Sequence, residues 1–291
     1  MFTLAASLGA TVLTSTAAAQ FQTRVIAENL AAPTGIAYGG GTTLYFTEVP
    51  TPGVNGKNGG QNRVVSLDAR TGAMFPISEG EPEPVNLAYL SGRDMVLWTC
   101  KSAGVILGVA PGHDPEMIVT DLNEPVGIAS IGDFVIFTEV PTPGVGGNEG
   151  GMNAVKVFDG VEVTTVDFGD PEPTDIAVST NGTLYWTCKS AGVIVRKPLN
   201  EDPEVILDDL ASPTGIALDR AGRVYFTEVP TPGVAGDDGG MNAVWRYTPD
   251  RGDLTLINFG DPEPTDITVI PSGRVVAWTC TSAGVIVAAY E

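Results

Sequence analysis

The chain has 291 residues, with 35 acidic against 15 basic side chains and a formal net charge of −20. Recognition of nucleic-acid phosphates or of an anionic membrane surface needs clustered lysine and arginine, so this balance excludes both as partners. Apolar residues make up 43% of the chain, which is enough for a hydrophobic core. The 36 glycines and 22 prolines favour many short strands joined by turns over long helices.

Residues 1–19 carry no charged side chain and end in three alanines before Gln20. An apolar segment that ends in small residues is typical of a secretory signal peptide, so we expect cleavage near Gln20 and a secreted or periplasmic protein. No later apolar run approaches the about 20 residues that a membrane-spanning helix needs. The sequence therefore predicts a signal peptide over 1–19, no membrane insertion, and a mature chain of residues 20–291.

Two motifs alternate along the mature chain and divide it into three long repeats of about 90 residues. The first motif, FTEVPTPGV, begins at Phe46, Phe137 and Phe226. The second motif, WTCKSAGVI or its variant WTCTSAGVI, begins at Trp98, Trp186 and Trp278. A sequence that repeats at a fixed period predicts repeated structural units packed against one another.

Each long repeat is itself double, because a short motif of the type P-x-x-I/L-A/T recurs at half the period. Its copies begin at Pro33, Pro84, Pro125, Pro173, Pro213 and Pro264. Between copies we find four runs rich in Val, Ile, Thr, Phe and Tyr, separated by turn residues, which predicts four antiparallel strands. Six such units predict an all-β, six-bladed β-propeller with pseudo-threefold symmetry, forming a single domain over 20–291.

The two ends of the mature chain complement each other. The last unit, from Pro264 to Glu291, has room for only three strands, whereas residues 20–32 contain one additional strand-like run, TRVIAEN. We expect this N-terminal strand to complete the outer edge of the sixth blade, because closing the ring leaves no open sheet edge.

The inner-strand motif PTGIA, followed by a glycine turn and YFTE, resembles NHL-type repeats. More broadly, the chain is similar to the calcium-dependent propellers of the gluconolactonase, regucalcin and strictosidine-synthase-like superfamily. That resemblance implies a calcium ion on the propeller axis, held by Asn or Asp at the start of inner strands, often directly before a glycine. Here the Asn and Asp stand at the glycine position itself, as Asn86, Asp175 and Asp266.

Many carboxylates are expected on the top face, the side that carries the loops leading into the first and third strands of each blade. Glu83, Glu172 and Glu263 precede inner strands, and Glu48, Glu139 and Glu228 end second strands. Converging carboxylates repel unless a cation neutralises them, and calcium prefers oxygen ligands. The metal-ligand candidates are therefore Asn86, Asp175, Asp266, Glu48, Glu139 and Glu228. The alternative interpretation is a solvated acidic rim without metal.

Two further alternatives stay open from the sequence. The glycine-rich loops that begin at Gly53, Gly144 and Gly233 offer a peripheral metal location, although one copy contains a lysine. Glu48, Glu139 and Glu228 can also be structural, with each carboxylate bonded to amides of the TPGV loop that follows it.

Cysteine and histidine limit the available chemistry. Cys100, Cys188 and Cys280 occupy equivalent places on alternate blades, too far apart for disulfides, so we expect three unpaired, buried thiols. His113 is the only histidine and falls in a loop of the bottom face, which excludes a Ser-His-Asp or Cys-His site in a top-face pocket.

Three functions remain compatible with the sequence. The first is a secreted, monomeric binding module whose acidic top face holds a divalent cation, a cationic ligand, or a small-molecule or protein partner. The second is a calcium-dependent hydrolase of a lactone or ester, in which the axial residues place Ca2+ and Glu83, Glu172 or Glu263 acts as base. The third is a structural scaffold.

Overall fold

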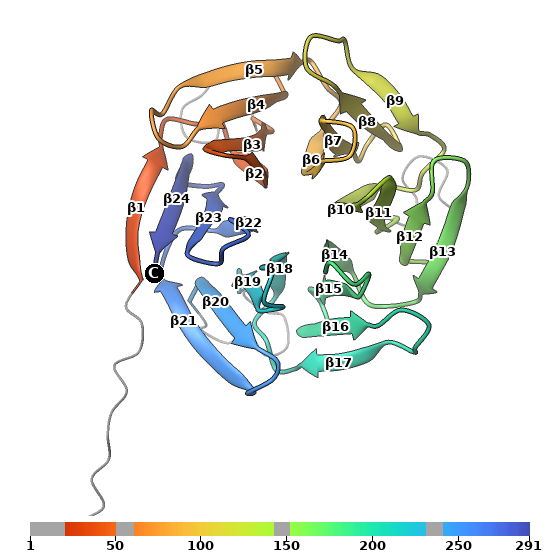
Figure 1. The fold of residues 1–291 in the computed structure, drawn as a ribbon, viewed down its shortest axis with the longest axis vertical. Helices are drawn as coiled ribbons and strands as arrows, with labels where there is room; N and C mark the ends of the chain where they lie inside the picture. The colour runs from red at the N-terminus through yellow and green to blue at the C-terminus, as the bar shows by residue number, and fades with distance from the viewer. Residues whose placement is uncertain (1–20, 51–60, 143–151, 231–240) are drawn as a thin grey trace, which may run out of the picture.

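Six four-stranded antiparallel sheets stand around a central axis like the blades of a propeller (Figure 1). The computed structural model describes residues 21–50, 61–142, 152–230 and 241–291. Each blade is a meander whose first strand lies nearest the axis and whose last strand lies at the rim. The predicted six-bladed propeller is confirmed, and no helix that could cross a membrane occurs in the described ranges.

The first half of the ring consists of blades 1, 2 and 3. Blade 1 contains β2 (Pro33–Gly40), β3 (Thr43–Glu48), β4 (Arg63–Asp68) and β5 (Met74–Glu79). Blade 2 contains β6 (Pro84–Leu90), β7 (Met95–Cys100), β8 (Val105–Val109) and β9 (Glu116–Val119). Blade 3 contains β10 (Pro125–Ile131), β11 (Phe134–Glu139), β12 (Ala154–Phe158) and β13 (Val163–Phe168).

The second half consists of blades 4, 5 and 6. Blade 4 contains β14 (Pro173–Val178), β15 (Leu184–Cys188), β16 (Val193–Lys197) and β17 (Glu204–Leu207). Blade 5 contains β18 (Pro213–Leu218), β19 (Val224–Glu228), β20 (Ala243–Thr248) and β21 (Asp253–Phe259). Blade 6 contains β22 (Pro264–Val269), β23 (Val275–Cys280), β24 (Val285–Tyr290) and the N-terminal β1 (Gln22–Ala27).

The ring closes through the N-terminal strand, as the sequence predicted. β1 pairs antiparallel with β24, with Gln22 opposite Tyr290 and Val25 opposite Val287. Figure 1 shows the red β1 outside the blue β24, so the two ends of the chain share one sheet. This pairing covers the edge of β24 that a three-stranded last blade would expose, and it gives blade 6 the same four strands as the other blades.

The hydrophobic core lies between neighbouring blades rather than inside any one of them. Second strands are buried on both faces, because each is covered by the adjacent sheets; β7 is buried along its whole length. Trp98, Trp186 and Trp278 on these strands are fully buried and pack in clusters that join two blades. Their burial explains why the WTC motif recurs in every even blade.

The three cysteines follow these tryptophans and are free and buried, as expected. Burial raises the pKa of Cys100 and Cys280 to about 12, and a neighbouring carboxylate adds to the effect in both cases. Because the thiolate is the reactive form, we expect no labelling of the native protein by Ellman's reagent at pH 8. Complete reaction should follow in guanidinium chloride, and rapid labelling of the native protein would contradict the buried placement.

Candidate functional site

Six buried threonines surround the axis at the second strands and set the positions of the inner strands. Each belongs to an F-T-E or W-T-C motif and is fully buried: Thr47, Thr99, Thr138, Thr187, Thr227 and Thr279. Every hydroxyl accepts a main-chain N–H from the inner strand of its own blade, at the place where the pairing of the first two strands shifts register. Four of them also donate to a carbonyl of the next blade, at 2.6–3.2 Å.

The sequence analysis did not single out these threonines. The signal was present, because threonine is the one polar residue that both repeated motifs share. Because this threonine occurs in the second strand of all six blades, it has a structural role in each blade and does not mark one particular site.

The three residues predicted to lie on the axis do come together there. Asn86, Asp175 and Asp266 start inner strands of blades 2, 4 and 6, and all three are buried. The Asn86 Nδ2 donates to Asp175 Oδ1 at 2.7 Å. Glycines from the odd blades pack against them: a Cβ on Gly127 would lie 2.6 Å from the Asp175 Cα. The alternation of glycine with Asn or Asp therefore lets the six inner strands approach the axis closely.

Both axial carboxylates bind main-chain amides from two blades at once. Asp266 Oδ1 accepts the Ile267 N–H and Oδ2 accepts the Ile36 N–H, each at 2.7 Å. Asp175 makes the equivalent pair of bonds with Ile176 and Ile216, at 2.8 and 2.7 Å. These bonds connect blade 6 to blade 1 and blade 4 to blade 5.

Burial and mutual repulsion make the axial carboxylates weak acids. Burial is the main cause that raises the pKa of Asp175 well above its ordinary value, and the charge of Asp266 raises it further. Burial likewise raises the pKa of Asp266 to about 7, although its amide bonds act in the opposite direction. At neutral pH the pair therefore retains a proton, because two like charges cannot both be solvated in this position.

The axial side chains do not fit a calcium centre in this arrangement. Calcium takes six to eight oxygen ligands, whereas Asn86, Asp175 and Asp266 offer five side-chain oxygens, each of which already accepts a main-chain N–H. Within the described residues, no group of three or more His, Cys, Asp or Glu side chains is placed to hold a metal ion. The trio also lines an axial cavity of about 190 Å³.

Glu48, Glu139 and Glu228 do not join the axial trio. Each is buried at the end of a second strand and accepts an N–H from the loop that precedes its own blade, the donors being Ala31, Asn123 and Ala211. Each also has a partner on the third strand: Arg63, Lys156 and the Trp245 indole. These glutamates therefore connect each odd blade to the loop that precedes it. The bonds predicted from the sequence were to the TPGV loop that follows each glutamate.

Glu83, Glu172 and Glu263 lie on the top face, partly exposed, where the chain turns into an inner strand. All three have left-handed backbone conformations, with φ between 48° and 51°. Their carbonyl oxygens accept the N–H of the residue after each cysteine, namely Lys101, Lys189 and Thr281. Glu83 is part of a top-face pocket.

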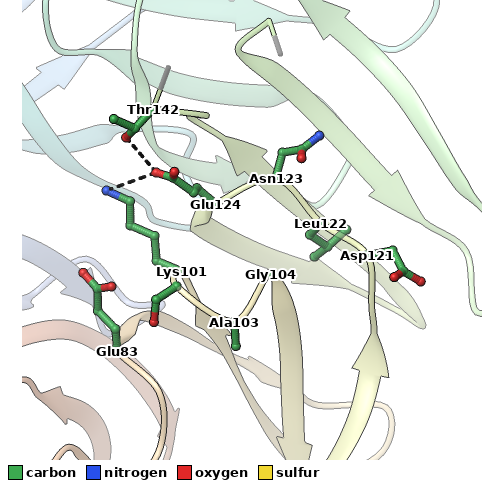
Figure 2. Close-up of a pocket in the computed structure, with 10 residues that line it drawn as sticks. Glu83, Lys101, Ala103, Gly104, Asp121, Leu122, Asn123, Glu124 and Thr142 are labelled. Atoms are coloured by element: carbon green, nitrogen blue, oxygen red, sulfur yellow. Dashed lines mark hydrogen bonds and ion pairs between the residues drawn. The ribbon is translucent and has the colours of Figure 1, made fainter. Parts of the chain in front are cut away.

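That pocket has a volume of about 490 Å³ and lies between blades 2 and 3. Figure 2 shows Glu124 at its wall, joined to both Lys101 and Thr142. The Thr142 Oγ1 donates to Glu124 Oε2 at 2.8 Å, and the Lys101 Nζ lies 3.7 Å from the same oxygen. The other polar lining residues are Glu83, Ser102, Asp121 and Asn123.

Glu124 is the functional candidate that the sequence analysis missed. Burial alone would raise the pKa of Glu124, but hydrogen bonds from Thr142 and the Lys101 ammonium outweigh it and lower the pKa, so the carboxylate stays charged. Its Oε1 is buried and has no hydrogen-bond donor among the described residues. One difference between the repeats could have indicated Glu124 in the sequence. The equivalent positions of the other two long repeats are occupied by Ala32 and Ser212, which carry no charge.

The remaining predicted site lies outside the described residues. The glycine-rich loops considered as peripheral metal sites fall almost entirely in 51–60, 143–151 and 231–240, which the structure does not describe. His113 lines a separate pocket with Asp94 and Tyr45, away from the top-face pocket between blades 2 and 3.

Comparison with known proteins supports the propeller fold but does not assign a family or a function to this chain. No protein-family model and no curated protein sequence matches the chain. Among solved structures, it is similar to a gluconolactonase from Xanthomonas campestris, with a TM-score of 0.73 and 15% identity over 93% of this chain and 89% of the other.

Two other neighbours have comparable coverage. The calcium-binding protein regucalcin from Agrobacterium tumefaciens gives a TM-score of 0.65 and 16% identity, over 92% of this chain and 93% of that one. Virginiamycin B lyase from Staphylococcus aureus gives a TM-score of 0.59 and 14% identity, over 94% and 100%. At these identities the likeness shows the propeller fold, the part of the predicted resemblance that the structure confirms.

Proposed function

We propose that this protein is a binding propeller that takes a small cationic ligand with N–H donors in the pocket between blades 2 and 3. The observation that carries the proposal is the buried Glu124 Oε1, which has no donor among the described residues. An unpaired buried acceptor costs about 1–3 kcal/mol, and a ligand N–H that reaches it removes this penalty. Glu83 and Asp121 add negative charge to the lining, against the single cation Lys101.

The lining favours an organic cation over a bare metal ion. The Lys101 ammonium lies 3.7 Å from Glu124 Oε2, so a divalent ion bound by this carboxylate would meet a fixed positive charge. An ammonium group carries half the charge of a divalent ion, a guanidinium delocalises its single charge, and both present N–H donors to Glu124 while Lys101 stays in place. Glu83 and Asp121, on either side of Lys101 and Glu124 in Figure 2, can neutralise a second positive group on the ligand.

Glu124→Ser introduces the residue found at the equivalent position of blade 5 and should weaken binding of a diamine such as putrescine. Loss of a charge-assisted hydrogen bond of about 1.5–3 kcal/mol corresponds to a roughly 10- to 100-fold higher Kd by calorimetry. Glu201→Gln, an exposed change on another loop, is the control that should keep wild-type affinity. Equal diamine binding by wild type and Glu124→Ser would refute the proposal.

A second candidate, hydrolysis of a lactone or ester, rests on the fold likeness to gluconolactonase. In that function Glu83, Glu172 or Glu263 would act as base beside an axial metal, although the axial oxygens are engaged by amides. The deciding assay is proton release from glucono-1,5-lactone, with calcium or with chelator, for wild type and Asp266→Ala. Calcium-dependent hydrolysis that Asp266→Ala abolishes would make this the function in place of amine binding.

We also propose that the protein is exported and acts as a monomer. The basis for export is the uncharged, alanine-rich segment 1–19, which lies outside the described residues. The basis for a monomer is that blade 6, like the other five blades, is a complete four-stranded sheet. Intact-mass measurement of the exported protein should give a chain that starts near Gln20. Light scattering should give the mass of one copy.

A further inference from the structure

A second cavity lies where the ring closes, between blades 6 and 1. It has a volume of about 300 Å³ and is lined by β1, β2, β3, β22, β23 and β24 together with the turns after β2, β4 and β22. These turns belong to the bottom face, opposite the pocket that contains Glu124. Its walls are mainly apolar, with Ile26, Leu44, Val275, Ala277 and Ala288 among the lining residues.

The only charged side chains in the lining of this cavity are two arginines, Arg24 on β1 and Arg70 in the turn after β4. Neither guanidinium forms an ion pair with an acidic group in the part of the chain that the structure describes. The Arg24 Cζ lies 5.1 Å from the centre of the Tyr290 ring, and this cation–π contact holds it at the cavity wall. The carboxylate nearest in sequence to Arg70, Asp68, accepts the Arg70 and Thr71 main-chain N–H groups. The Arg70 charge is among the causes that lower the pKa of Asp68, after the hydrogen bond from the Thr71 main chain, but the two side chains form no ion pair in the described residues.

The internal repeats show that these features are specific to this junction. The positions equivalent to Arg24 in the other two long repeats are Glu116 and Glu204, so the charge is reversed. Asp250 of blade 5 occupies the place that corresponds to Arg70.

The cavity wall differs between the repeats as well. Ala277 on β23 precedes the buried tryptophan of its WTC motif, where blades 2 and 4 have Leu97 and Tyr185. A large side chain at this place would fill the space between the two blades. The closing junction therefore combines a smaller wall residue with a positive rim, in a protein whose net charge is −20.

We propose that this cavity binds an amphipathic carboxylate, with an apolar body against Ile26, Leu44 and Ala277 and an anionic head between Arg24 and Arg70. Guanidinium groups bind carboxylates through two parallel N–H bonds, and a small apolar cavity buries a short hydrocarbon chain. A cationic or purely polar ligand does not complement this lining. The site is separate from the amine pocket of the proposed function, so either proposal can fail alone.

The test is calorimetric titration of the full chain carrying Glu124→Ser, which impairs the amine pocket of the proposed function, with four probes that separate charge from apolar surface: octanoate, octan-1-ol, octylamine and acetate. We expect octanoate to bind, octan-1-ol to bind at least about tenfold more weakly, and octylamine and acetate to give no binding. Equal binding of octanoate and octylamine would overturn the proposal, because it would show an apolar cavity without anion recognition. Absence of octanoate binding would overturn it directly.

Two variants place the ligand in the cavity. Arg24→Glu copies the charge of blades 2 and 4 and should weaken octanoate binding at least about tenfold. Ala277→Leu copies the wall of blade 2 and should block binding by filling the cavity, with thermal unfolding recorded to confirm that the variant folds. Arg251→Glu, an exposed arginine outside the lining, and Glu124→Ser, in the amine pocket, should both retain wild-type octanoate affinity. Unchanged affinity in Arg24→Glu would refute the assignment of the head group even if Ala277→Leu did not fold.

Discussion

Asp266→Asn should flatten the dependence of stability on pH. In the folded protein the pKa of Asp266 is raised to about 7, chiefly by burial, so the folded state keeps a proton that the unfolded chain releases near pH 4. Because the folded state then binds more protons, the free energy of unfolding must fall as pH rises from about 4 to about 7. Asp266 contributes roughly 4 kcal/mol to this fall, and the raised pKa of Asp175 adds to it. Urea unfolding across this range measures the profile.

The asparagine variant tests the cause of that slope. An amide cannot ionise, so Asp266→Asn should lose the part of the slope that comes from Asp266 and keep the part that comes from the buried Asp175. Its stability relative to wild type should therefore improve from pH 5 to pH 8. Exposed Asp114→Asn is the matched control and should keep the wild-type profile. A variant curve that runs parallel to wild type would show that Asp266 does not hold the proton. The unfolding buffers contain a metal chelator, because a bound cation would stabilise the ionised form of the two carboxylates.

Thr187→Val should destabilise the protein by about 2–5 kcal/mol, since each buried polar group left unpaired costs about 1–3 kcal/mol. The Thr187 hydroxyl accepts the Asp175 N–H at 3.1 Å and donates to the Thr214 carbonyl of the next blade at 2.7 Å. Valine has nearly the same shape, so the change removes these bonds without leaving a large cavity. Chemical denaturation reports the loss.

Two companion variants separate the hydroxyl from the side-chain shape. Thr187→Ser keeps the hydroxyl and should recover most of the stability, whereas exposed Thr164→Val on an outer strand should change it little. If Thr187→Val were as stable as wild type, the threonine ring would be a by-product of strand packing rather than a connection between blades.

The fold was predictable because its determinants are local and repeated. The proline that begins each inner strand, the β-rich runs and the turn residues recur in every unit, and a three-stranded last unit requires a fourth strand from elsewhere. The pairing of β1 with β24 was therefore predictable from the number of strands in each repeat. Free cysteines followed in the same way, from the spacing of equivalent positions on alternate blades.

The axial site was predictable in its location and not in its bonding. Asn86, Asp175 and Asp266 occupy the same motif position, so a ring of inner strands must bring them together. Their engagement by main-chain amides depends on the register shift near the start of each inner strand, for example between Pro264 and Ile267. No residue pattern indicated that Ile36, 230 positions away, donates to Asp266.

By itself, the sequence determined the six blades, the closing strand and the residues that face the axis, because these follow from periodicity and from closing a ring. Tertiary structure alone decided which carboxylates are structural, as for Glu48 beside Arg63, and which line a pocket, as for Glu124. It also placed Arg24 and Arg70 beside one apolar cavity. The physical reason is that ion pairs and cavities form between sheets whose residues are far apart in the chain, so the relative placement of the blades sets each charge's partner and surroundings.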